Sequence, residues 1–230
     1  MPADTATLDV LRVFCAADRS GGNPLGVFLH GGDVPEARRQ PIAHELGFAE
    51  TVFVDDLERA EMRIFTPETE LPLAGHPLVG TAWLLRERGH EPKTLRPPAG
   101  EVAVRFDGEL ACTAGRPEWG PAWEFVEVGS AEEVEALDGP PDGLRLVGVW
   151  AWLDEPRGLI RARVFAPEAG VTEDEATGSA AMRLCALLGR ELEIRQGRGS
   201  VIFAEPLDDG TAEIRGLVVA DETREHPVGG

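Results

Sequence analysis

The chain has 230 residues, a formal net charge of −19 at pH 7 and an isoelectric point near 4.6. Such a charge repels nucleic acids and anionic membranes, which excludes both as partners. No run of roughly 18 apolar residues is present to span a bilayer, and the first ten residues lack the basic start and apolar middle of a signal peptide. We therefore expect a cytoplasmic protein whose three cysteines are reduced and buried.

The first half of the chain predicts several strands and two helices. Apolar residues that alternate with period two, in runs separated by turn residues, indicate the strands. These are expected at residues 8–14, 25–29, 48–54, 61–65, 94–95, 102–106 and 110–113. A short helix is expected between Pro35 and Gly47. A second helix begins near Pro77 and is apolar nearly all round, so we expect it to be buried.

The second half follows a segment, residues 116–121, in which proline, glycine and charge interrupt the periodicity. We expect a short helix at residues 131–137, a longer helix from about Thr177 to Leu188, and strands at residues 144–153, 158–165, 201–204 and 212–219. This pattern predicts an N-terminal lobe of residues 1–115, a C-terminal lobe of residues 122–220 and a loose polar tail of residues 221–230.

An internal repeat connects the two halves. Residues 63–68 (RIFTPE) align with residues 163–168 (RVFAPE), and residues 80–82 (GTA) align with residues 178–180 (GSA). The offset between the copies falls from 100 to 98, which indicates a loop that differs by two residues. Two copies of one strand–loop–helix unit are therefore expected, with the two helix N-termini near a shared cleft.

Glu50 is the first candidate for chemistry. Period-two alternation places it on the same face as Val52 and Val54, which are expected in the core. A poorly solvated carboxylate has a raised pKa and can accept and return a proton near neutral pH. The alternative is a different register, which leaves Glu50 at an exposed strand edge.

The two helix starts hold the remaining candidates. His76 lies at the first helix, where the positive helix end favours a neutral imidazole that contacts a ligand or, alternatively, caps its own backbone. Before the second helix, Asp174 and Thr177 are suited to N-capping. Gly178 and Ser179 also present amides and a hydroxyl that can hold a carboxylate. No histidine or cysteine spacing is typical of a metal site.

Together these segments resemble the phenazine-biosynthesis isomerases of the PhzF type, which have a diaminopimelate-epimerase-like fold. The resemblance rests on the order and spacing of residues 22–24 (GNP), 49–51 (AET), 63–67, 70–72 (ELP), 74–77 (AGHP), 80–82, 163–167, 173–174 (ED) and 176–180 (ATGSA). It implies an α+β fold of two pseudo-symmetric lobes, each a mostly antiparallel sheet rolled round a central helix, and usually a homodimer.

The resemblance also implies a function. The glutamate that matches Glu50 moves a proton on a small cyclic carboxylic acid of the dihydro-hydroxyanthranilate type, without cofactor or metal. The residues that match Gly75, His76, Asp174 and Ser179 bind the substrate, and we include Gly178 with them. The expected activity is that of a cofactor-independent isomerase or epimerase acting by general acid/base catalysis.

Three departures from the family pattern bear on that expectation. Glu175 replaces the usual proline, which is expected to loosen its loop and to add a charge beside an anion site. Residues 196–200 (QGRGS) form a shortened loop, and the whole chain is shorter than most members. The alternatives are a non-catalytic protein that binds or assembles with small carboxylic acids and a structural dimer whose motifs are only helix caps.

Overall fold

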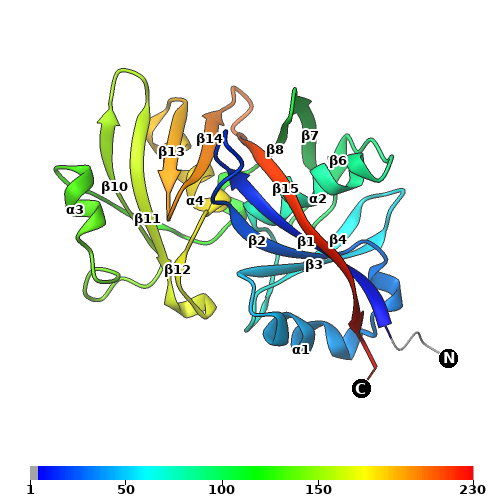
Figure 1. Ribbon diagram of the computed structural model, residues 1–230. Helices are drawn as coiled ribbons and strands as arrows, with labels where there is room; N and C mark the ends of the chain where they lie inside the picture. The colour runs from blue at the N-terminus through cyan, green and yellow to red at the C-terminus, as the bar shows by residue number, and fades with distance from the viewer. Residues whose placement is uncertain (1–4, 230) are drawn as a thin grey trace.

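The computed structural model describes residues 5–229, which form two sheets joined by one long strand (Figure 1). The first sheet has the order β5-β4-β3-β2-β1-β15. Its strands are β1 (Thr5–Cys15), β2 (Asn23–Phe28), β3 (Glu50–Asp56), β4 (Glu61–Phe65), β5 (Glu70–Leu71) and β15 (Ala212–Pro227). Strands β2 and β3 are parallel and are connected through α1 (Glu36–Leu46), while the other neighbours are antiparallel.

The second sheet continues from β15 through β14, β13, β11 and β10 to β9. Its strands are β9 (Glu124–Glu127), β10 (Val147–Asp154), β11 (Leu159–Ala166), β12 (Val171–Asp174), β13 (Leu192–Gln196) and β14 (Ser200–Pro206). Strands β6 (Thr94–Leu95), β7 (Val102–Asp107) and β8 (Leu110–Gly115) join the same sheet through the pairing of β8 with β15. The short helix α3 (Ala131–Glu135) lies at the far end of this lobe (Figure 1).

Each sheet encloses one apolar helix, as the resemblance implied. Helix α2 (Gly75–Glu87) packs against β1, β2, β3, β8 and β15, and α4 (Gly178–Leu188) packs against β14 and β15. Helix α1 covers the opposite face of the first sheet, where Phe28 and Phe53 stack with ring centroids 5.0 Å apart. These observations confirm the expected α+β class. No helix in the described part of the chain is long and apolar enough to cross a membrane.

The predicted lobe boundaries differ from the structure in two places. Residues 221–227, expected to form a loose tail, belong to β15, where residues 217–227 pair with β1 along its whole length. Residues 94–115, expected in the N-terminal lobe, pair within the second sheet. Each lobe therefore receives a strand from the other half of the sequence. The last part of β15 is exposed on both faces, so its polar composition is typical of a tail.

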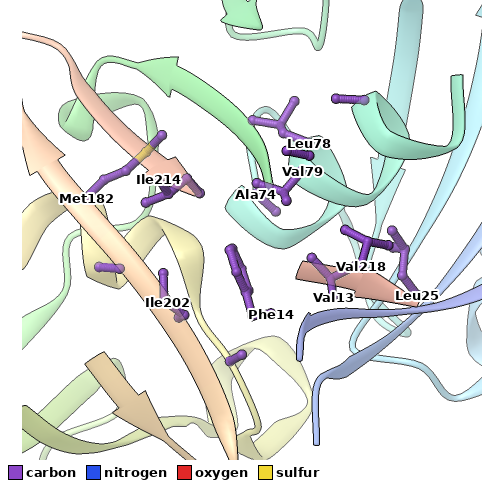
Figure 2. Packing of buried hydrophobic residues seen from close by; sticks show 14 of the residues in the cluster. Val13, Phe14, Leu25, Ala74, Leu78, Val79, Met182, Ile202, Ile214 and Val218 are labelled. Carbon is purple, nitrogen blue, oxygen red and sulfur yellow. The ribbon is translucent and has the colours of Figure 1, made fainter. Parts of the chain in front are cut away.

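At the crossing point of β15, β1 has a bulge at Phe14. The register with β15 shifts between Val13 and Cys15, and Phe14 adopts a left-handed φ of 67°, a conformation that costs a bulky residue about 1 kcal/mol or more. Its ring is fully buried between the α2 side and the α4 side of the core, as Figure 2 shows. Gly216 lies against the ring, and a side chain there would collide with it. The bulge therefore joins the two lobes into one core.

The repeat is visible as two equivalent arginine–glutamate pairs. Arg63 on β4 donates through Nε and Nη2 to the two carboxylate oxygens of Glu70, at 2.7 and 2.6 Å. Arg163 on β11 donates in the same way to Glu173, at 2.8 and 2.7 Å. Such bidentate pairs fix the geometry of both partners. They hold β5 and β12, the strands that lead into the two central helices.

These equivalences correct the alignment of the helix starts. The helices begin at Gly75 and Gly178, so the structural match is residues 75–77 with residues 178–180 rather than residues 80–82 with residues 178–180. The offset therefore rises from 100 to 103, and the second loop is longer by three residues. Gly80, which we had matched with Gly178, lies in the middle of α2, where it allows close packing against Leu25 and Val13.

Candidate functional site

Glu50 begins β3 and lies on the face that packs around α2. Val52 and Val54 share this face and belong to the central core, whereas Phe53 packs on the other side with α1. The Glu50 side chain is 12% exposed, and its Oε2 has no hydrogen-bond partner among residues 5–229. The predicted inward register is therefore confirmed, and the alternative of an exposed strand edge is excluded.

His76, in the first turn of α2, lies beside this carboxyl. The His76 Nδ1 atom is 3.2 Å from Oε2 of Glu50, and the ring is 2% exposed. Its Nε2 atom is buried without a hydrogen-bond partner in the described chain. The histidine therefore contacts Glu50 and does not cap its own helix. Both side chains keep an unsatisfied polar atom, which is costly unless a ligand satisfies it.

Asp174, the last residue of β12, is held by both lobes. From β2 of the first lobe, Asn23 Nδ2 donates to Asp174 Oδ1 at 2.6 Å. From the second lobe, the Thr177 hydroxyl donates to Asp174 Oδ2 at 2.6 Å. Gln196 Nε2 in turn donates to Thr177 Oγ1 at 2.9 Å. A short buried hydrogen-bond chain therefore fixes the orientation of the Asp174 carboxylate between the lobes.

Burial sets the protonation of these groups. It raises the pKa of the Glu50 carboxyl well above its ordinary value, and nearby Asp174 raises it further. Burial also raises the pKa of Asp174 to about 6, while the hydrogen bonds from Thr177 and Asn23 act in the opposite direction. Burial lowers the pKa of His76 to about 3. The imidazole is therefore neutral at pH 7, as predicted, and its contact with Glu50 is not an ion pair.

The N-termini of α2 and α4 meet at Gly75 and Gly178. A Cβ atom built on Gly75 would lie 2.5 Å from the Cα of Gly178, and one built on Gly178 would lie 2.7 Å from the Cα of Gly75. Carbon atoms in ordinary contact lie about 3.5–4.0 Å apart, so both positions require glycine. The two glycines thus bring two positive helix ends together at the interface of the lobes.

Neither helix start is capped by a side chain from the described residues. Ala74 is the N-cap of α2, and Thr177 is the N-cap of α4, but the Thr177 hydroxyl donates to Asp174 instead of accepting from its helix. Our expectation that Thr177 and Asp174 serve as caps is therefore wrong. Uncapped first-turn amides beside a cleft are suited to hold an anion.

A small cavity lies between the lobes beside these groups. It is lined by three of the predicted residues, Glu50, Asp174 and Ser179, together with apolar residues that include Leu73 and Leu146. Gly75, His76 and Gly178 lie directly behind this lining, where Gly75 contacts Gly178 and His76 contacts Glu50. The cavity volume is about 50 Å³, room for one or two water molecules.

A wider depression of about 350 Å³ opens next to the cavity. The two share Ala49, Val171 and Asp174 in their linings. Sites for small organic ligands have volumes of about 300–1,000 Å³. The inner cavity is therefore too small for a ring-sized molecule, whereas the outer depression has the volume of a small-ligand site.

Trp123 and Ser179 close the other end of the cavity. The Trp123 indole donates through Nε1 to Ser179 Oγ at 3.0 Å, and both residues line the cavity together with Pro121. Residues 116–121 were predicted only as a linker, so sequence reasoning did not assign Trp123 to the site. An aromatic residue with a polar handle just after a proline-rich linker was the available signal.

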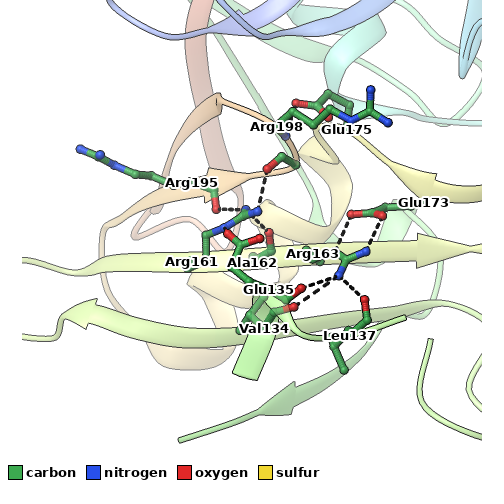
Figure 3. A network of polar contacts seen from close by, with 11 residues as sticks. Val134, Glu135, Leu137, Arg161, Ala162, Arg163, Glu173, Glu175, Arg195 and Arg198 are labelled. Atoms are coloured by element: carbon green, nitrogen blue, oxygen red, sulfur yellow. Dashed lines mark hydrogen bonds and ion pairs between the residues drawn. The ribbon is translucent and has the colours of Figure 1, made fainter. Parts of the chain in front are cut away.

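Polar contacts hold the shortened loop at residues 196–200 (Figure 3). Arg161 donates to the carbonyls of Arg195 and Gly197 at 2.9 and 2.6 Å. The Glu175 carboxylate accepts from the Arg198 amide at 2.7 Å and from the Ser200 hydroxyl at 2.9 Å. Glu175 thus ties its own segment to the loop at residues 196–200, contrary to the loosening of that segment that we expected. Its charge raises the pKa of neighbouring Asp174.

Asn23 and Gln196 complete the site. Asn23 belongs to the GNP segment that carried the resemblance, yet we gave it no role. The sequence pattern predicts a loop at Gln196, but this residue is the last of β13. Both are about 2% exposed. Both amide side chains contact Asp174 across long stretches of sequence, so the contacts that assign them to the site are visible only in the folded structure.

Comparisons with known proteins place the chain among isomerases. The family model for phenazine biosynthesis-like protein (PhzC-PhzF) matches residues 12–130 and 118–206. The trans-2,3-dihydro-3-hydroxyanthranilate isomerase of Pseudomonas aeruginosa is 33% identical over 224 residues, which cover 80% of this chain and 80% of that protein.

Solved structures share the fold. A PhzF-family phenazine biosynthesis protein of Bacillus anthracis has a TM-score of 0.79 at 22% identity, covering 97% of this chain and 99% of that one. A predicted epimerase of Pseudomonas aeruginosa has a TM-score of 0.77 at 25% identity, covering 96% and 99%.

Proposed function

Because the chain belongs to the PhzC/PhzF family of phenazine biosynthesis-like proteins, we propose that this isomerase moves a proton on a small cyclic carboxylic acid by general acid/base catalysis at Glu50. The substrate class follows the name of the Pseudomonas aeruginosa relative, a dihydro-hydroxyanthranilate isomerase. The observation that carries the proposal is a buried carboxyl with an unsatisfied oxygen, beside a neutral histidine, at a cavity between the lobes.

In the proposed step, the ionised Glu50 takes a proton from a ring carbon conjugated with the substrate carboxylate. The electron pair of the broken C–H bond moves into the conjugated system, and Glu50, whose carboxyl proton exchanges with solvent, then returns a proton to another carbon of that system. Substrate and product therefore have the same composition. The pKa of Glu50, raised by burial, is suited to both halves of this exchange because the group neither holds nor releases the proton too strongly.

The developing negative charge needs stabilisation, and the helix ends are suited to supply it. Among residues 5–229, neither lysine nor arginine lines the cavity. We propose that the free amides at the starts of α2 and α4, with the Ser179 hydroxyl, hold the substrate carboxylate. His76 Nε2, buried without a partner, is proposed to hydrogen-bond the substrate, and Asp174 to accept a hydrogen bond from a substrate hydroxyl or amine.

No step of this proposal requires a cofactor or a metal ion. The homodimer implied by the resemblance stays a prediction, which sedimentation or light scattering of the purified protein will test.

The decisive experiment follows carbon-bound hydrogen in deuterated water. Wild-type protein, Glu50→Gln and the control Glu58→Gln, an exposed carboxylate elsewhere, are incubated with trans-2,3-dihydro-3-hydroxyanthranilate and related cyclic acids. Proton NMR reads isomerisation and deuterium incorporation. We expect Glu50→Gln to be slower by about 10²–10⁴-fold, the usual contribution of general acid/base catalysis, while Glu58→Gln keeps the wild-type rate.

Two results would contradict the proposal. Exchange by Glu50→Gln at the wild-type rate would remove Glu50 from the chemistry. Tight binding of these acids to the wild-type protein without any isomerisation or exchange would instead support the non-catalytic binding protein. Thermal stabilisation by each acid, measured in parallel, separates that second result from a simple failure to bind.

A further inference from the structure

Gln196 makes three buried hydrogen bonds, yet it does not line the cavity. Its Nε2 atom donates to the backbone carbonyl of Asp174 at 2.8 Å and to Thr177 Oγ1 at 2.9 Å. Its Oε1 atom accepts from the backbone amide of Thr177 at 3.3 Å. One side chain thus holds the segment between Asp174 and the start of α4 at both ends.

The chemistry of these partners fixes the direction of every bond. The Asp174 carbonyl can only accept, so the amide nitrogen of Gln196 must face it, and the flipped amide is excluded. The same nitrogen then donates to Thr177 Oγ1. Because the hydroxyl oxygen already accepts from Gln196, its single hydrogen is free to point to Asp174 Oδ2, 2.6 Å away. Hydrogen bonds linked in this way polarise and strengthen one another.

The position of Gln196 is itself well determined. Arg161 holds the carbonyls of Arg195 and Gly197, the two neighbours of Gln196 in the chain (Figure 3). Glu175 holds the other end of the shortened loop through Arg198 and Ser200. Both ends of the turn beside this glutamine are therefore held by side-chain contacts.

We propose that Gln196 is a positioning residue, which commits the Thr177 hydroxyl to donate to Asp174 and so presents the Asp174 carboxylate to the substrate as a fixed acceptor. Asn23 completes the arrangement from the other lobe by donating to the second oxygen. The inference rests on the proposed function for its catalytic meaning, but the hydrogen-bond arrangement can be tested without turnover.

The consequence is a division of roles between two neighbouring carboxyls. Asp174 receives two hydrogen bonds, which favour its ionised form, whereas Glu50 on β3 has an oxygen without a partner. Besides Glu50, the charged group that acts on Asp174 is Glu175, the next residue in the chain. Two carboxyls whose pKa values are driven apart in this way take different roles, one taking up and returning a proton and one accepting hydrogen bonds.

The test measures the titration of the Asp174 carboxyl by ¹³C NMR on the full-length protein. Gln196→Met keeps the length of the side chain and removes its hydrogen bonds. Thr177→Val removes the hydroxyl but keeps the shape, and Thr177→Ser keeps the hydroxyl. The control is Gln40→Met, because Gln40, the only other glutamine, also donates to backbone carbonyls, those of Thr66 and Pro67.

We expect the pKa of Asp174 to rise by about one unit in Thr177→Val, which loses a hydrogen bond to the charged form, and in Gln196→Met, in which the Thr177 hydroxyl is no longer committed to donating that bond. It should return close to the wild-type value in Thr177→Ser and stay there in Gln40→Met. An unchanged Asp174 titration in folded Gln196→Met or Thr177→Val would overturn the proposal and leave Gln196 a purely structural role.

A second readout is the pH profile of deuterium exchange. In Gln196→Met the acidic limb should move upward with the Asp174 titration, and kcat should fall more than KM rises. A wild-type protein that catalyses no exchange would refute the proposed function. The NMR titration would still decide whether Gln196 positions Asp174, so the two failures are distinguishable.

Discussion

A methyl group added at Gly75 tests how closely the two helix starts must approach. In Gly75→Ala the new Cβ would lie 2.5 Å from the Cα and 2.6 Å from the carbonyl carbon of Gly178. Both atoms belong to the backbone, so no side-chain rotation relieves the contact. Because carbon atoms in contact need about 3.5 Å, the helix starts must separate by about 1 Å.

This displacement has two separate costs. Overpacking of a closely packed core typically reduces the free energy of unfolding by about 1–3 kcal/mol, which for a chain of this size lowers Tm by about 5 °C. A misplacement of about 1 Å at a catalytic site reduces turnover by about 10²-fold. Glu50 and Ser179 lie on opposite lobes of the cavity, so we expect exchange to fall further than stability alone would explain.

The assay compares urea unfolding and deuterium exchange for Gly75→Ala and the control Gly139→Ala. A Cβ on Gly139 meets nothing within 4 Å, and its φ lies outside the left-handed region. The control should therefore be neutral or slightly stabilised, because alanine restricts the unfolded chain. Equal unfolding free energies and equal exchange rates in the two variants would refute the steric reasoning.

Gly178→Ala gives an independent check of the same contact. Its Cβ would lie 2.6 Å from Ile214 Cδ1 and 2.7 Å from the Cα of Gly75. When the methyl group of one alanine has already separated the two helix starts, the methyl group of the second alanine meets a weaker steric clash. The double variant should therefore lose less stability than the sum of the single variants.

Two further predictions concern protonation and binding. The pKa of His76 falls from 6.5 to about 3 on burial, so its contribution to stability is complete above pH 6.5 and is lost as pH falls toward 3, by up to about 1.4 kcal/mol per pH unit. Urea unfolding of His76→Gln should therefore be less sensitive to acid than that of the wild type. The raised pKa values of Glu50 and Asp174 have the opposite effect, because they make the folded protein more stable as pH falls. Both groups are present in the wild type and in His76→Gln, so their effects largely cancel when the two proteins are compared. Unfolding free energies that change equally with pH in the two proteins would contradict the prediction. Trp123→Phe loses one hydrogen bond to Ser179, worth about 1 kcal/mol, and should bind a cyclic carboxylic acid about fivefold more weakly by calorimetry, whereas Trp152→Phe, outside the cavity, should bind as the wild type does.

The sequence contained enough local signal to predict most elements and the side of β3 on which Glu50 lies. Alternation of apolar residues is a property of the strand itself, so the burial of Val52 and Val54 followed directly. The repeat was also visible, because residues 63–68 (RIFTPE) match residues 163–168 (RVFAPE). In the structure, Arg63 and Arg163 lie on strands β4 and β11 and form equivalent ion pairs. The helical apolar runs likewise indicated α2 and α4.

Contacts between distant residues escaped the sequence reasoning. The GTA and GSA segments share more residues than GHP and GSA, yet the contact of Gly75 with Gly178 shows which helix starts are equivalent. Thr177 has the position and chemistry of a helix cap, but in the folded chain its hydroxyl donates to the Asp174 carboxylate and accepts no hydrogen bond from the helix amides. Gln196 contacts Asp174 across 22 residues, a pairing that no local pattern reports.

The crossing of β15 between the sheets has a consequence for synthesis on the ribosome. β1 emerges before the other strands of the first sheet, but its partner in β15 follows about 200 residues later, a delay of about 10–40 s at ordinary translation rates. During that time the first sheet has an open edge, a surface on which unpaired strands aggregate. Asp9 and Arg12 interrupt the apolar run of β1 and give this edge a charged character until β15 arrives. The nascent chain thus cannot complete its first lobe before it has made its second.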